Sequence, residues 1–183
     1  MFDATETSVQ TLTDRAKQAE DAALSHKGIT NSEGASASFG VVNVLIATSN
    51  GFSASYKRSS SGVSAVVIAE KDGQMERDYD YSAAVFAEDL DAPDAIGHSA
   101  AKRTLSRLGA NKPKTGQFPV IYDQRVSSSI VSTLAGAING AAVARGTSFL
   151  KDNLGQQIAS KGLNFIDDPL RPVSYTHLRA HET

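Results

Sequence analysis

Residues 41–81 read VVNVLIATSNGFSASYKRSSSGVSAVVIAEKDGQMERDYDY, and their pattern gives the strongest indication of the fold. Apolar and polar residues alternate with a period of two in four runs, at 42–46, 52–56, 63–67 and 75–81, as in strands with one buried face. Asn50-Gly51, between the first two runs, is typical of a type I′ hairpin turn, and Asp72-Gly73 falls in a later turn. The sequence therefore predicts an antiparallel β-meander.

Two helices are expected to cover the apolar side of this sheet. Residues 5–25 have helical spacing, with Thr7 and Gln10 available as a capping box, and residues 93–108 have Pro93 in the first turn. The apolar residues that define the two faces are Val9, Leu12, Ala16, Ala19 and Ala23 in the first helix and Ile96, Ala100, Leu105 and Leu108 in the second. The predicted fold class is α+β: an antiparallel β-meander covered by helices, followed by the start of a second, incomplete domain.

The second domain begins after a polar segment, ANKPKTGQ, at residues 110–117. We expect a short strand at 118–122, an apolar helix from Val126, a loop at 145–148 and a strand at 163–166. This piece is too short to close a core around so apolar a helix. The predicted organisation is a first domain over 1–110, a linker over 111–117 and an incomplete domain over 118–172.

Composition excludes several classes of function. The net charge is −2 and no lysine and arginine cluster exceeds Lys57-Arg58, which argues against a nucleic-acid or anionic-membrane surface. The chain has no cysteine, so disulfides and thiolate metal sites are excluded. The first residues lack the pattern of a secretory signal, and we expect a cytoplasmic protein. The uncharged run at 126–144 is long enough for a membrane span, but its serines and glycines favour a buried helix.

The last eleven residues, VSYTHLRAHET at 173–183, break from the preceding pattern. We interpret them as the translation of a sequencing-library adapter and exclude them from functional reasoning. His177, His181 and Glu182 would otherwise suggest a metal site, because two histidines four apart on a helix can share an ion. His26 and His98 then remain, and we interpret His26 as a helix-end residue and His98 as a structural residue.

Other candidate sites are weaker. Glu76, Asp78 and Asp80 share one face of a strand. One interpretation is a set of paired carboxylates for acid–base chemistry. The other is a solvated sheet face or a contact with another subunit. The serines at 127–129 and Ser132 have no His-Asp arrangement nearby, so they do not indicate a hydrolytic nucleophile. The glycine spacing does not indicate nucleotide binding.

Six segments, in order, make the chain resemble the TldD/PmbA metalloprotease family, in its PmbA (TldE) branch, over residues 3–172. They are ITNSEG at 29–34, ATSNGF at 47–52, MERDYDY at 75–81, AKRTL at 101–105, LAGAING at 134–140 and RGTSFL at 145–150. The resemblance implies that a first family domain is missing before Met1. It also implies that 1–110 is the central domain and that 118–172 starts the C-terminal domain.

In the catalytic branch of that family a helix carries His-Glu-x-x-x-His, in which the histidines hold zinc and the glutamate handles the proton of a metal-bound water. Alignment on residues 145–148 places Ser132 and Ala137 at the ligand positions and Thr133 at the position of the base. The resemblance therefore implies no catalytic residue and no cofactor in this chain. It also implies a heterodimer with a TldD-like subunit that holds zinc and acts on unfolded peptides.

Contacts with that subunit or with substrate are expected at Glu76, Arg77, Asp78, Tyr79, Arg145 and Thr147. The alternative function is a metal-independent peptide-binding or regulatory module that works without a protease partner.

Overall fold

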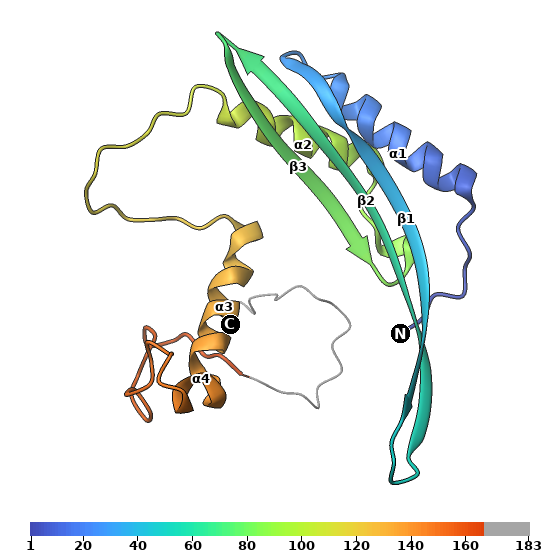
Figure 1. Cartoon of the computed structure of the whole chain (residues 1–183). Helices are drawn as coiled ribbons and strands as arrows, with labels where there is room; N and C mark the ends of the chain where they lie inside the picture. The colour runs from blue at the N-terminus through green and yellow to red at the C-terminus, as the bar shows by residue number, and fades with distance from the viewer. Residues whose placement is uncertain (167–183) are drawn as a thin grey trace. The chain divides into compact units, whose positions relative to one another are not determined.

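The computed structural model describes residues 1–166 and divides into two units, Met1–Pro113 and the unit that begins at Lys114. The elements of the first unit, in chain order, are α1 (Val9–Leu24), β1 (Ile29–Ala47), β2 (Ser53–Lys71), β3 (Gln74–Ala84), the 3₁₀ helix η1 (Ala87–Asp89) and α2 (Pro93–Arg107) (Figure 1). The second unit contains α3 (Gln124–Ile138) and α4 (Gly140–Ala144).

The three strands form an antiparallel sheet in the order β1-β2-β3. This confirms the predicted meander, but the number of strands differs. The runs at 52–56 and 63–67 belong to the single strand β2, and β1 begins at Ile29 rather than near Val41. The serines between the two runs of β2 break the hydrophobic alternation, yet their backbones continue the ladder, because Ser59 pairs with Val41 and Ser61 pairs with Phe39.

Both helices cover the same face of this sheet. Alternate residues of β2 from Ser59 to Ala69 are buried on that face, and Val67 is fully enclosed. The core consists of small side chains: Ala19 and Ala23 from α1, Val63, Ala65 and Val67 from β2, and Ile96, Ala100 and Ala101 from α2. Side chains this small let the helices lie close to the sheet and to each other.

The ends of the elements correct two details of the sequence prediction and agree with a third. Ser8, not Thr7, caps α1, and its Oγ accepts a hydrogen bond from the Thr11 N–H at 3.1 Å. Asp72 and Gly73 both have positive φ, 53° and 76°, as a type I′ turn requires. In the other hairpin only Gly51 has positive φ, and its N–H donates to the Thr48 carbonyl at 3.1 Å, so the loop at 48–52 is not type I′.

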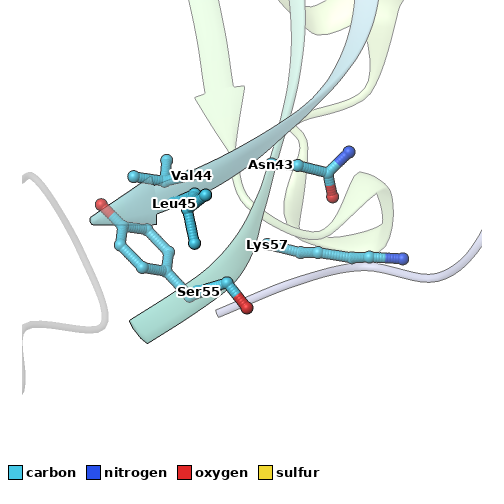
Figure 2. A pocket seen from close by; sticks show the side chains of 6 residues that line it. Asn43, Val44, Leu45, Ser55 and Lys57 are labelled. Atoms are coloured by element: carbon cyan, nitrogen blue, oxygen red, sulfur yellow. The ribbon is translucent and has the colours of Figure 1, made fainter. Parts of the chain in front are cut away.

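The distal parts of β1 and β2 extend beyond the helices as a two-stranded arm, residues 41–57 (Figure 1). Its large apolar side chains are exposed: Val41, Val42, Leu45, Ile46, Phe52 and Tyr56. Figure 2 shows an open hollow on the arm, lined by residues that include Asn43, Leu45 and Lys57. The Lys57 ammonium lies 5.5 Å from the centre of the Phe2 ring, a cation–π contact that holds the N-terminal segment against the arm.

In the second unit the predicted helix is present but is divided at Asn139, which ends α3 and caps α4. The predicted strands at 118–122 and 163–166 are wrong, since neither segment has regular structure. A strand needs a neighbour for its backbone groups, and no strand of the described chain pairs with either segment. Within residues 1–166 no helix is both long enough and apolar enough to cross a membrane. The tail at 173–183, with His177, His181 and Glu182, lies outside the described residues.

Candidate functional site

Ser132 and Ala137, the positions that the resemblance aligns with metal ligands, both lie on α3, which begins after Asp123. The Asp123 Oδ1 accepts a hydrogen bond from the Arg125 N–H at 2.9 Å and so caps the helix. Ser132 and Thr133 are exposed, whereas Ala137 is buried at 6% exposure. The structure therefore places the two positions in different surroundings.

Ala137 is covered by the loop that follows α4. The Ser148 Oγ donates a hydrogen bond to the Ala137 carbonyl at 2.5 Å and accepts one from the Leu150 N–H at 2.9 Å. Ser148 is itself only 7% exposed. The Thr147 Oγ1 and N–H both donate to the Ala142 carbonyl, which binds this loop to α4 as well. The loop at 145–148 is thus hydrogen-bonded both to the end of α3 and to α4.

The side chains of α3 do not fit the zinc that the motif would hold. Zinc sites use imidazole, thiolate or carboxylate ligands, and α3 has no histidine, cysteine, aspartate or glutamate. Its hydroxyls satisfy backbone carbonyls instead: the Thr133 Oγ1 donates to the Ser129 carbonyl at 2.8 Å. In the part of the chain that the structure describes, no group of three or more histidine, aspartate or glutamate residues could hold a metal ion.

The acidic residues of β3 face α2 rather than solvent. Arg107 Nε lies 3.3 Å from Glu76 Oε2, and Arg107 Nη1 lies 3.6 Å from Asp78 Oδ2. Arg103 Nε lies 3.5 Å from Asp80 Oδ2, and Asp78 is buried at 7% exposure. Ion pairs with Arg103 and Arg107 explain this carboxylate face, and they connect β3 of the sheet to α2.

Arg77 and Tyr79 lie on the opposite face of β3, which the helices leave open. Arg77 Nε lies 2.6 Å from Glu33 Oε2, and the Tyr79 and Tyr81 rings stack with centroids 6.2 Å apart. The predicted contact residues are thus divided between two faces of β3, with Glu76 and Asp78 in the ion pairs. Arg145 and Thr147 lie in the second unit, where both are exposed. Their role as subunit or substrate contacts stays a prediction.

The structure also brings together two residues that the sequence did not connect. His26 Nε2 and His98 Nδ1 lie 2.9 Å apart, and the two rings meet edge to face. They are separated by 72 positions and belong to the end of α1 and to α2, so no spacing in the sequence could indicate the contact. Only the packing of the two helices on one face of the sheet reveals it.

Comparison with known proteins gives the same family along both units. The profile of the PmbA/TldA metallopeptidase central domain matches residues 2–108, and that of the C-terminal domain matches residues 115–179. Metalloprotease PmbA of Escherichia coli O157:H7 is 38% identical over 170 residues, and the PmbA homologue of Haemophilus influenzae is 34% identical over 170 residues. Both alignments cover 92% of this chain, which spans 38% of the length of each relative.

Solved structures agree with this assignment. A crystal structure from Bacteroides thetaiotaomicron, named as a candidate modulator of DNA gyrase, has a TM-score of 0.78 and 28% identity, over 87% of this chain and 37% of that one. A similarly named protein from Thermotoga maritima, at 23% identity and a TM-score of 0.72, shares the fold over 86% of this chain and 38% of its own. With a family profile matched over more than half of its length, the chain belongs to the PmbA/TldD metallopeptidase family.

Proposed function

We propose that the chain is part of a non-catalytic, PmbA (TldE)-like subunit of a cytoplasmic heterodimeric metalloprotease. In this proposal a TldD-like partner supplies zinc, and the assembly cleaves unfolded peptides. One observation carries the proposal: α3, which holds the metal motif in catalytic relatives, has Ser132, Thr133 and Ala137 at the motif positions. None of these side chains can replace an imidazole ligand or a carboxylate base near neutral pH.

The burial of Ala137 supports this proposal as a second argument, separate from the residue types at the motif positions. Ala137 is 6% exposed, its backbone carbonyl accepts the hydrogen bond from the Ser148 Oγ, and the loop at 145–148 is bonded to both α3 and α4. A histidine is much larger than alanine, so at this buried position it would require neighbouring groups to move. The segment therefore suits a role in packing or contact better than a role in catalysis.

The arm at 41–57 supports a role that depends on another protein. It exposes large apolar side chains on a two-stranded ribbon, and such a ribbon gains stability when a partner covers it. A metal-independent peptide-binding or regulatory module would use the same surface. The two functions differ in whether a TldD-like subunit is required.

The test measures zinc content and peptide cleavage for the chain alone and after co-expression with a TldD-like protein. The four histidines of the chain are replaced by glutamine in a parallel variant, which leaves α3 unchanged and removes every imidazole ligand from the chain. The proposal predicts co-purification with the partner and cleavage only when the partner has its own motif. Stoichiometric zinc and cleavage by the chain alone would overturn it, and peptide binding without any association with the partner would favour the regulatory module.

A further inference from the structure

We propose that His26 and His98 form a two-histidine site for a divalent late transition-metal ion, with Cu²⁺ as the strongest binder. His26 lies in the turn after α1, and His98 lies in the second turn of α2. Their nitrogens Nε2 and Nδ1 approach to 2.9 Å, and His98 is exposed while His26 is half-buried. Both rings are therefore accessible to an ion from solvent.

The separation of the two nitrogens suits a shared ion as well as a hydrogen bond. Imidazole nitrogens lie about 2.0–2.1 Å from a bound ion, so two of them at right angles to each other are about 2.9 Å apart. Square-planar and octahedral ions have such right angles between neighbouring ligands. For both lone pairs to point at one ion in this geometry, each ring must turn by about 45° away from the line that joins the two nitrogens. This turn is a change of side-chain torsion angles.

Close packing of α1 on α2 fixes this arrangement before any ion binds. A Cβ on Gly97 would lie 2.9 Å from the Cβ of Ala22, so the residue next to His98 touches α1 directly. At Gly28, two residues after His26, a Cβ would lie 2.9 Å from the Leu105 Cδ2. The segments that hold the two histidines are thus each packed against the opposite element, and binding would require ordering of side chains only.

Protonation is consistent with ligation. The existing contact needs one ring to donate an N–H and the other to accept it, so at least one of the facing nitrogens has a proton. When an ion binds, that proton has to leave the facing nitrogen, so that both facing nitrogens present lone pairs to the ion.

The rest of the coordination sphere would be water, because no third histidine, aspartate or glutamate joins the pair within residues 1–166. Two nitrogen ligands favour Cu²⁺ over Ni²⁺ and Zn²⁺ on the general order of stability, and they give no advantage to Mg²⁺ or Ca²⁺, which prefer oxygen. The site is therefore expected to be selective for ion type and modest in affinity.

The experiment uses the full 183-residue chain with His177→Ala and His181→Ala, so that the histidines of the tail cannot contribute. Titration with Cu²⁺ should show one site per chain with two nitrogen ligands in the electron paramagnetic resonance spectrum. At about a hundredfold excess of free Cu²⁺ over Kd, the unfolding temperature should rise by roughly 10 °C. The same concentration of Mg²⁺ should leave the unfolding temperature unchanged.

Four variants in that background decide the assignment. His26→Gln and His98→Gln should each weaken Cu²⁺ binding about tenfold or more, because a chelate becomes a single ligand. The double variant should show little further loss, since either substitution alone already breaks the chelate. Lys27→Gln, next to His26, is the matched control and should bind as the parent does. Far-ultraviolet circular dichroism verifies that each variant is folded.

Two results would overturn the site. One is Cu²⁺ affinity that does not change in either histidine variant, which would place the ion elsewhere. The other is a loss in only one of the two variants, or losses that add in the double variant, since both would mean independent single-ligand binding.

Discussion

The carboxylate of Asp3 connects the N-terminal segment to Ala87, 84 positions later: its Oδ2 accepts a hydrogen bond from the Ala87 N–H at 3.0 Å. Its Oδ1 accepts another from the Thr5 N–H at 2.9 Å. These bonds, with that from Ala87 the stronger cause, hold the pKa of Asp3 below its ordinary value of 3.8. The ionised form is therefore favoured in the folded state, and the N-terminal segment is attached to the start of η1.

This lowered pKa predicts the pH dependence of stability. The contribution of Asp3 is fully present above the unfolded-state pKa, near 3.8, and is lost as pH falls through the lower folded-state pKa. Asp3→Asn should reduce stability at neutral pH and remove this part of the acid dependence. Urea unfolding between pH 2 and pH 7 measures both effects. Equal slopes of stability against pH for the two proteins would show that these bonds do not contribute.

Arg77 of β3 and Arg107 of α2, which form ion pairs on opposite faces of β3, should differ in their contribution to stability. Arg77→Gln breaks an exposed ion pair with Glu33 and should cost less than about 0.5 kcal/mol. Arg107→Gln removes a cation from Glu76 and from the buried Asp78, and we expect a cost of about 1–2 kcal/mol. Chemical denaturation of both variants in the same buffer gives the comparison. A larger loss of stability for Arg77→Gln than for Arg107→Gln would contradict this prediction.

Restoring the lost motif should not restore a metal site. The triple variant Ser132→His, Thr133→Glu, Ala137→His supplies the residue types of the catalytic branch. Ala137 is buried, however, and the larger side chain should destabilise the second unit by about 1–3 kcal/mol or more. Ser132→His alone, at an exposed position, is the control and should have little effect. Tight zinc binding by the triple variant without loss of stability would contradict the geometry of α3.

Gly97 should not tolerate even one added methyl group. A Cβ there would lie 2.0 Å from the carbonyl oxygen of Ala19, a backbone atom that cannot move alone. Gly97→Ala should therefore destabilise the first unit by about 1–3 kcal/mol or more, in spite of a helix-propensity gain of about 1 kcal/mol. Gly136→Ala, at a helical glycine whose Cβ would meet nothing within 4 Å, should instead be neutral or stabilising. Thermal unfolding of both variants is the measurement.

The elements whose signals are local could be predicted from the sequence. Periodicity identified α1, α2 and the meander, and Pro93 marked the start of α2 correctly. The extent of β2 could not be predicted, because Ser59 and Ser61 interrupt the hydrophobic pattern although both are buried and their backbones pair with β1. The supposed strands at 118–122 and 163–166 have apolar composition but no pairing neighbour in the described chain. Composition alone cannot provide that neighbour.

The candidate site likewise has features that could be predicted from the sequence and features that could not. The loss of ligand chemistry at Ser132 and Ala137 can be read from residue types, but the burial of Ala137 depends on a loop eleven positions later in the chain. The pairing of Glu76 and Asp78 with Arg107 depends on the register of α2 against β3. The contact of His26 with His98 follows from the crossing of α1 and α2. All three are tertiary properties, for which a single sequence has no local signal.

The arm at 41–57 has a consequence for the kinetics of local opening. Its backbone hydrogen bonds connect two strands only, and neither helix shields them, whereas those of β2 from Val63 to Ala69 lie beneath α1 and α2. Amide protons of the arm should therefore exchange with deuterium rapidly, through fraying of the hairpin tip. Those under the helices should exchange slowly, because their exchange requires global unfolding. Mass spectrometry of exchange in the isolated chain should show two populations along one continuous strand. A binding partner would then reveal its footprint by slowing only the faster population.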